Sequence, residues 1–345
     1  MKHITYNIKK IFLKILVILF CVISYMLHVT YVSAQQVTLS ISPPLLEVFI
    51  KPGKSIMVAY KIENKGDPVV VKTNVLPFEP KDQQGNIRIK KEFEGPVRFS
   101  LDNSNIQLDQ PYLLKTKDSQ QILLRIRIPE GAPLGDYYYT LLAETQPSSN
   151  IGGNQSTLAK ATIGSNILIT VTESGRVEAR GKITLFNVLP RFKLNLFDTS
   201  VNLFDSTDKI PVVLVVENTG KNLIKPNGNI VLRGNFGEKA EYEIIGQNIL
   251  AESQRQLAAS PSAMVDCEEN EKKAVYCQKS TSLVLSGFFV GLYKLSASLT
   301  FGENSPRIFS SASFIALPFK FLIGIFIALA VAWIIIKKIS KDNDG

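Results

Sequence analysis

Hydrophobic and polar residues alternate along much of the chain between residues 35 and 316. The clearest segments with a two-residue period are SIMVAYKIE (55–63), PVVVKTNV (68–75), QILLRIRI (121–128) and NILITVT (166–172). In the third segment, four aliphatic side chains share one face of the expected strand, and Arg125 and Arg127 lie on the other. This pattern is typical of half-buried strands in antiparallel sheets. No long stretch of the region shows a convincing helical period, so the sequence predicts an all-β structure here.

An internal repeat divides this region into two parts. YKIENKGD (60–67) is echoed by LVVENTGK (214–221), and LGDYYYTLLA (134–143) is echoed by VGLYKLSASL (290–299). The glycines of the two landmark segments are 69 residues apart in the first copy and 71 in the second. The same order at nearly the same separation predicts two tandem copies of one architecture.

Each landmark has a structural reason. A strand that ends in Glu-Asn-x-Gly supplies residues that tolerate a positive φ where the chain turns. Gly-x-Tyr opens a late strand, where the glycine permits a tight entry and the tyrosine hydroxyl can reach the backbone. About seven short strands per copy favour immunoglobulin-like β-sandwiches. We therefore predict two tandem sandwiches, at residues 35–174 and 175–314, joined near ESGRVEARG (173–181).

The N-terminus has the pattern of a secretory signal peptide. Four lysines precede an apolar core that runs from Ile15 to Ile23, and a small-residue site, YVSA, ends at Ala34. We predict a signal peptide at residues 1–34, cleaved after Ala34. The alternative is an uncleaved signal anchor.

The C-terminal stretch LPFKFLIGIFIALAVAWIIIKKISK (317–341) is apolar between Phe321 and Ile336 and ends in lysines. It predicts a transmembrane helix at residues 315–337 and a cytoplasmic tail at 338–345. With a cleaved signal peptide, this arrangement gives a single-pass cell-membrane protein with an extracellular ectodomain and a cytoplasmic C-terminus. A cell-wall sorting signal is the rival interpretation, but no Thr-Gly follows the Leu-Pro pair.

The net charge of +9 does not indicate nucleic-acid binding. Residues 1–34 carry +4 and the segment after Phe319 carries +2, which leaves +3 for the whole middle of the chain. The basic residues therefore belong mostly to segments that handle membranes.

Cysteine and histidine usage limits the chemistry of the mature chain. Cys267 and Cys277 are the cysteines that remain after cleavage, and outside the cytosol we expect them to form a disulfide. His3 and His28 would both be removed. The loss of histidine disfavours a metal site as well as Ser-His-Asp and Cys-His catalysis. We see no phosphate-binding loop, and we expect no enzyme activity, cofactor or small-molecule substrate.

Binding is the class of function that the sequence favours. The predicted ectodomain has no tryptophan, so tyrosines are the candidate aromatic surface for a glycan. In DYYYT, strand alternation places Tyr137 and Tyr139 on one face and Tyr138 on the other, with one set expected in the core. The long polar loop 144–165 is either a binding loop or a connection between the last two strands.

The segments ISPPLLEVFIKPGKSIMVAYKIENKGD (41–67) and RIRIPEGAPLGDYYYTLLAE (125–144) resemble bacterial surface proteins of the WxL-interacting type. The resemblance implies a signal peptide, a peptidoglycan-binding-like first sandwich, a partner-binding second sandwich and a C-terminal membrane anchor. No binding residue can be carried over. We expect a membrane-anchored cell-surface protein that binds cell-wall glycan or another surface protein. The alternative is a scaffold subunit of a membrane or envelope complex that binds no glycan.

Overall fold

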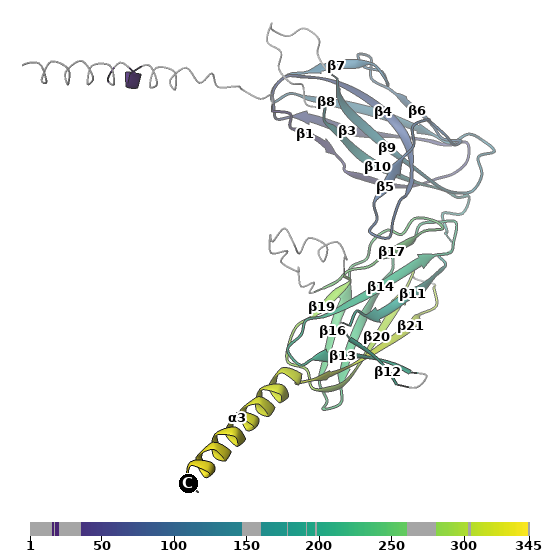
Figure 1. Cartoon of the computed structure of the whole chain (residues 1–345). Coiled ribbons are helices and arrows are strands. Elements are labelled where there is room, and N and C mark those ends of the chain that lie inside the picture. The colour runs from purple at the N-terminus through teal and green to yellow at the C-terminus, as the bar shows by residue number, and fades with distance from the viewer. Residues whose placement is uncertain are drawn as a thin grey trace, which may run out of the picture.

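The structure is a computed structural model of the whole chain (Figure 1). It describes residues 16, 18–20, 36–146, 160–177, 179–190, 192–196, 199–260, 281–302 and 305–343. Two β-sandwiches follow one another along the chain, and a single helix leaves the second sandwich at its far end. The predicted fold class, two tandem immunoglobulin-like sandwiches followed by an apolar C-terminal helix, is therefore confirmed.

The first sandwich contains two sheets. One sheet has the order β1 (Leu39–Ser42), β3 (Ser55–Asn64), β8 (Ser119–Arg127), β6 (Arg98–Leu101). The other has the order β2 (Leu45–Ile50), β10 (Thr162–Val171), β9 (Gly135–Gln146), β4 (Val69–Pro80), β5 (Ile87–Ile89), with β7 (Pro111–Leu114) also paired to β4.

The second sandwich repeats this plan with additions. Its smaller sheet holds β11 (Gly181–Val188), β14 (Ile210–Asn218), β17 (Gln254–Gln256) and β19 (Leu283–Leu285). The larger sheet has the order β12 (Phe192–Leu196), β13 (Thr199–Asp205), β21 (Ile308–Leu317), β20 (Gly291–Thr300), β15 (Asn227–Gly234), β16 (Lys239–Ile244), β18 (Ala259–Ser260).

The strand pairings confirm the predicted duplication. In each sandwich, the first strand pairs antiparallel with the long strand that ends in Asn-x-Gly, as β1 does with β3 and β11 with β14. A following strand pairs parallel with the last strand of the sandwich, as β2 does with β10 and β13 with β21. The landmark glycines Gly135 and Gly291 both have a positive φ and open β9 and β20.

Each sandwich has its own hydrophobic core. The four aliphatic residues that the alternation in 121–128 places inward are fully buried: Ile122, Leu124, Ile126 and Ile128. Burying an aliphatic side chain of this size contributes about 1.5–3 kcal/mol. The alternation in the sequence therefore identified a strand that supplies much of the first core.

A buried asparagine occupies the same position in both copies. Asn64 and Asn218 are each 0% exposed. Asn64 donates through Nδ2 to the carbonyls of Asp67, Leu114 and Lys115, and its Oδ1 accepts from the Gly66 N–H at 3.0 Å. Asn64 therefore joins its own turn to a second, distant segment of the first sandwich.

Asn218 makes the equivalent contacts in the second copy. Its Nδ2 donates to the carbonyls of Asn222, Ile249 and Leu250, and its Oδ1 accepts from the Gly220 N–H at 2.9 Å. The Asn-x-Gly landmark is thus a buried hydrogen-bonding device as well as a turn.

The last strand and the helix meet at Pro318. Strand β21 continues to Leu317, because Ala316 pairs with Gly291 of β20 and Leu317 pairs with Asp205 of β13. Pro318 has no N–H to continue the sheet, and helix α3 (Phe319–Asn343) begins directly after it. The helix therefore starts four residues later than the predicted span 315–337 and also ends later.

Asn64→Ala tests the buried asparagine. The substitution leaves several backbone groups unpaired in the core, so we expect the free energy of unfolding of the first sandwich to fall by about 3 kcal/mol. Urea unfolding of the detergent-solubilised chain, followed by circular dichroism, measures this loss. The control is Asn105→Ala at an exposed loop position. Equal midpoints for the two variants would contradict the structural role of Asn64.

Candidate functional site

The three tyrosines of DYYYT occupy three different environments. Tyr139 is 1% exposed and lies in the first core, where its ring stacks on Phe93 at a centroid distance of 5.6 Å. Tyr137 is half-buried on the same face, and its hydroxyl donates to the carbonyl of Pro133 at 2.9 Å. Tyr137 and Tyr139 therefore lie on the same face of β9, beside the first core.

Tyr138 lies on the opposite face of β9, which the second sandwich covers. Its ring stacks on Phe78 at 5.8 Å, and its hydroxyl accepts a 2.8 Å hydrogen bond from the Ala251 N–H. Burial raises the pKa of the Tyr138 hydroxyl, which therefore stays protonated and donates to Asp136. The three tyrosines do not form one exposed aromatic surface, because one face of this strand is core and the other is the joint between the sandwiches.

Asp136 connects the two sandwiches. Its carboxylate accepts hydrogen bonds from Thr170 Oγ1 at 2.8 Å and Tyr138 OH at 3.1 Å within the first sandwich. From the second sandwich it accepts Asn222 Nδ2 at 2.9 Å and the backbone N–H of Leu223. Bonds to a charged acceptor are stronger than those between neutral groups.

Further polar contacts continue along the joint. The Gln256 N–H donates to the carbonyl of Gln83 at 2.7 Å, and Gln83 Nε2 donates to Gln254 Oε1 at 2.8 Å. Asn248 Nδ2 donates to Glu47. The sandwiches are therefore held together by directional hydrogen bonds from several loops, which favours one defined arrangement.

A cavity of about 370 Å³ opens beside this joint. Its lining comes from both sandwiches. The apolar part includes Leu45, Phe78 and Leu168. The polar part includes Asp82, Asn86, Asn166, Gln247, Asn248, Gln254 and Arg255. We call this cavity the interdomain cleft.

Two polar atoms of the interdomain cleft have unused hydrogen-bonding capacity. Asn248 Oδ1 and Arg255 Nε are buried and have no hydrogen-bond partner within the part of the chain that the structure describes. Arg255 is held in place by a 2.7 Å bond to the carbonyl of Asn248 and by contact with Gly85, where no Cβ would fit. Burial lowers the pKa of Arg255, but a guanidinium remains charged at neutral pH.

These groups suit a polar ligand. An amide oxygen can accept a hydrogen bond from a hydroxyl, a guanidinium N–H can donate one, and the apolar lining can pack on carbon. No cluster of metal-ligating side chains is found among the described residues. The interdomain cleft therefore combines hydrogen-bond donors and acceptors with an apolar wall.

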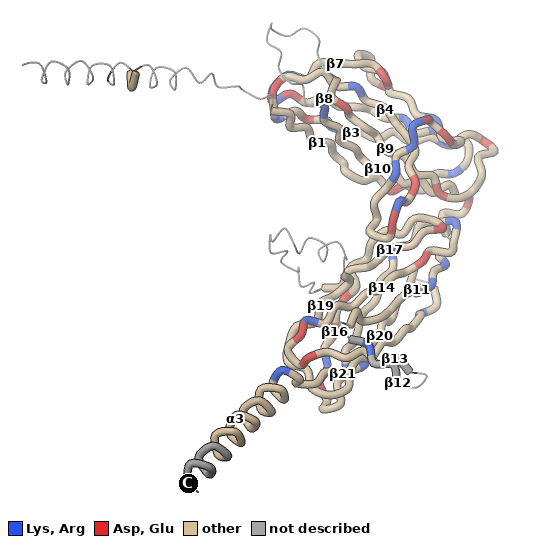
Figure 2. Tube along the Cα trace, viewed as in Figure 1, with Lys and Arg blue, Asp and Glu red and all other residues tan. Residues whose placement is uncertain are grey.

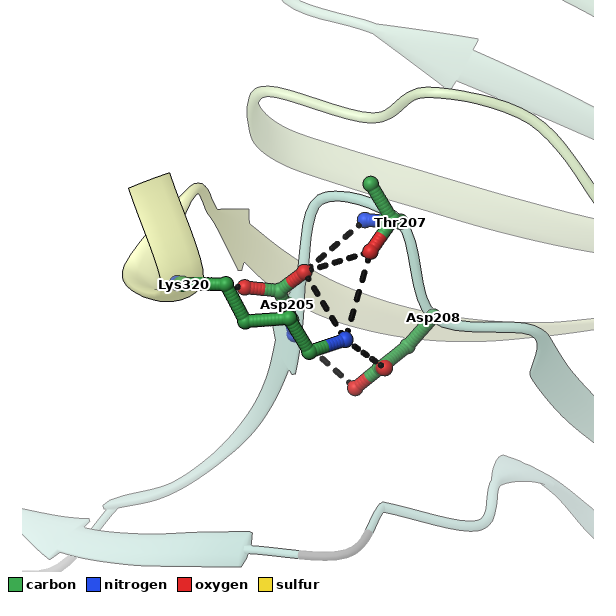
Figure 3. Close-up of polar contacts among 4 residues, drawn as sticks. All are labelled: Asp205, Thr207, Asp208 and Lys320. Carbon is green, nitrogen blue, oxygen red and sulfur yellow. Dashed lines mark hydrogen bonds and ion pairs between the residues drawn. The ribbon is translucent and has the colours of Figure 1, made fainter. Parts of the chain in front are cut away.

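A second polar cluster joins the helix to the second sandwich (Figure 3). The Lys320 N–H donates to Asp205 Oδ2 at 3.0 Å, so Asp205 caps the first turn of α3. Lys320 Nζ lies 3.3 Å from Asp205 Oδ1, 3.1 Å from Asp208 Oδ1 and 3.3 Å from Thr207 Oγ1. We call these four residues the helix clamp.

The helix clamp stabilises the ionised form of Asp205. The backbone N–H of Lys320, followed by the hydroxyl of Thr207, holds the pKa of Asp205 well below its usual range. The carboxylate is therefore charged at any pH near neutral and keeps its contacts with Lys320.

Helix α3 is long and apolar enough to cross a membrane. Residues Phe319–Ile336 have a mean hydropathy of 2.6, and none of this window is buried against the rest of the protein. Basic and acidic residues are interspersed along both sandwiches, whereas the part of α3 that Figure 2 colours is charged only at its start. In the sequence, Lys337 and Lys338 follow directly after Ile336. The prediction of an apolar C-terminal helix is confirmed.

Three predicted site residues lie outside the described residues. They are the disulfide cysteines Cys267 and Cys277 and the cleavage-site residue Ala34. Most of loop 144–165 also lies outside them. These expectations remain predictions.

Comparison with known proteins gives only weak likenesses. No protein-family model matches the chain, and no curated protein sequence matches it. The class 5 fimbriae chaperone CfaA is 10% identical, with a TM-score of 0.36 over 80% of this chain and 99% of that one. The Escherichia coli chaperone DraB is 12% identical, with a TM-score of 0.34 over 81% and 98%. A PapD-like domain of human CEP192 is 18% identical, with a TM-score of 0.27 over 43% and 95%.

Asp136→Ala tests the joint between the sandwiches. Loss of the carboxylate removes the acceptor of the Leu223 N–H, and we expect hydrogen exchange at that amide to accelerate about tenfold or more. Asp102→Ala, which breaks an ion pair on the surface of the first sandwich, is the matched control. Unchanged protection at Leu223 in the Asp136 variant would show that the carboxylate does not hold the joint.

Asp205→Asn tests the helix clamp through its pH dependence. Because the pKa of Asp205 is lowered on folding, its stabilising effect is complete above a pH of about 4 and is lost as the pH falls further. We expect the variant to have a lower Tm than the natural chain at pH 7, and the difference to shrink as the pH falls towards 3. Calorimetry in detergent measures both curves. A Tm difference that does not vary with pH would contradict this account.

Proposed function

We propose that the chain is a membrane-anchored cell-surface protein that binds cell-wall glycan in its interdomain cleft. In the proposed orientation, the sandwiches lie outside the cell and the C-terminus lies in the cytoplasm. The apolar span, the lysines that follow it and the signal-peptide pattern at the N-terminus support this orientation. The resemblance to WxL-interacting proteins supports a bacterial cell-wall setting.

The observation that carries the proposal is the pair of unpartnered polar atoms in the interdomain cleft, Asn248 Oδ1 and Arg255 Nε. Neighbouring amide side chains add further donors and acceptors. A sugar ring presents hydroxyl groups at its edge and C–H groups on its face, and the cleft offers polar walls beside an apolar part for both. A neutral or weakly acidic saccharide therefore fits its chemistry.

The structure also supports presentation of the cleft at a defined place above the membrane. The helix clamp fixes α3 to the β13–β14 turn, and the pairing of β13 with β21 joins that turn to the larger sheet. Asp136 then joins the second sandwich to the first. A binding site carried in this way needs little reorganisation when it meets its ligand.

A scaffold subunit is the second candidate. Strand β2 forms the edge of its sheet, and Phe49 on it is 60% exposed. An open strand edge with an exposed aromatic residue is suited to pairing with a neighbouring protein. This candidate predicts a fixed protein partner and no affinity for glycan.

Co-sedimentation of the full chain in nanodiscs with insoluble peptidoglycan tests the proposal. We expect saturable binding that survives moderate salt, because hydrogen bonds in a cleft are screened less than surface charges. Asn248→Ala should weaken binding about tenfold, since it removes an unpaired acceptor from the cleft. Asn105→Ala, at an exposed loop in the first sandwich, should leave binding unchanged.

Failure to bind at micromolar protein would overturn the glycan proposal. Equal binding by the Asn248 and Asn105 variants would place the glycan site elsewhere on the ectodomain. Co-purification of a fixed protein partner without glycan affinity would favour the scaffold.

A further inference from the structure

Two loops of the second sandwich lie at the end where the helix emerges. Strand β20 begins at Gly291, which pairs with Ala316 just before the helix. Strand β15 ends at Gly234, which pairs with Tyr293 near the start of β20. The strand pairings therefore place the turn 235–238 and the loop 286–290 at the end of the second sandwich from which α3 begins.

Each of these loops exposes a phenylalanine. Phe236 is 77% exposed and Phe288 is 69% exposed. The ring of Phe236 lies over Gly291, where an added Cβ would be 3.5 Å from Cε2. Large exposed aromatic side chains at one end of a domain are unfavourable in water and indicate an interaction surface.

The position of Phe288 is fixed by its buried neighbour. The Phe289 ring packs edge-on against Tyr293 at 5.3 Å, and its N–H donates to the carbonyl of Ser206 at 2.9 Å. The Ser206 N–H in turn donates to the carbonyl of Leu317 at 3.0 Å. Two backbone hydrogen bonds therefore separate the loop of Phe288 from the residue that precedes Pro318 and the apolar span.

The charges around these loops suit a membrane surface. Lys209 is exposed in the turn that also carries the helix clamp. Lys239 is exposed directly after the turn of Phe236, in which Glu238 accepts a hydrogen bond from the Phe236 N–H. Aromatic rings with neighbouring lysines are typical of segments that lie at the boundary between lipid headgroups and acyl chains. Because the two loops lie at the end of the second sandwich from which the apolar helix begins, we expect their partner to be a lipid bilayer.

We propose that Phe236 and Phe288 insert into the bilayer interface beside the helix, so that the second sandwich rests on the membrane. This inference rests on the membrane anchoring proposed above. The helix and the two phenylalanines then form three points of attachment. Three such points fix the tilt of the ectodomain, which a single helix leaves free.

Fluorescence quenching by lipid tests the proposal with the full chain in nanodiscs. Trp333 is the one tryptophan of the sequence, so Phe236→Trp or Phe288→Trp in a Trp333→Phe background reports on a single site. With lipids brominated near the headgroup end of the acyl chains, we expect both variants to lose about half of their emission. Aqueous acrylamide should quench them weakly.

Phe309→Trp in the same background is the matched control. Phe309 is 72% exposed on β21. Ala316 is seven positions further along the same strand, a rise of about 23 Å. Its variant should be quenched by acrylamide and not by brominated lipid. If the Phe236 and Phe288 variants behave like this control, the inference is overturned.

The natural chain separates failure of this inference from failure of the membrane anchor. Trp333 lies within the apolar span and should be quenched by brominated lipid. If Trp333 is quenched and the two loop positions are not, the membrane anchor stands, and the proposed insertion of Phe236 and Phe288 is overturned. Absence of quenching at Trp333 overturns the anchor and this inference together.

Discussion

The carboxylate of Asp136 accepts hydrogen bonds from both sandwiches. The buried side-chain amide of Asn218 positions the loops that bind it. Asn218 binds the carbonyl of Asn222, and the Asn222 side chain donates to Asp136. Asn218 also binds the carbonyl of Leu250, one residue before the Ala251 N–H that contacts Tyr138. The buried asparagine that closes the turn of the second sandwich therefore also presents two loops to the first.

A carboxylate also forms the junction at the other end of the second sandwich. Asp205 ends β13, caps the helix through the Lys320 N–H and pairs with the Lys320 ammonium group. Each junction thus contains one carboxylate that accepts backbone and side-chain hydrogen bonds at once. Such groups are costly to bury without their partners, so each junction favours a single arrangement. The joint at Asp136 determines the shape of the interdomain cleft. The helix clamp determines where the second sandwich lies relative to the helix.

Local patterns in the sequence were enough for the elements and the duplication. Alternation identified β3, β4, β8 and β10, and the landmark segments identified equivalent strands in both copies. The roles of the two tyrosines at Gly-x-Tyr also agree, because the hydroxyls of Tyr137 and Tyr293 both bond to backbone a few residues upstream. These features depend on residues close in the chain, which is why the sequence reveals them.

The candidate site could not be predicted in the same way. Its lining joins Leu45 to Arg255, and only the packing of one sandwich on the other brings such distant residues together. One signal was available: Asp136 stands where the second copy has Leu292, and this departure from the repeat marks the joint. The helix also begins later than the sequence predicts, because the apolar residues before Pro318 suit a strand and a membrane span equally well.

The hydrogen bonds at the joint favour one fixed arrangement of the two sandwiches around the interdomain cleft. Pulsed electron–electron double resonance measures the distance between spin labels at Ser100 in the first sandwich and Lys294 in the second. The labels are attached by a chemistry that spares cysteine. Both positions are exposed, so the labels should not disturb either core. We expect a single narrow distance distribution for the full chain in nanodiscs. A broad distribution would mean that the sandwiches move independently and that the cleft has no fixed shape.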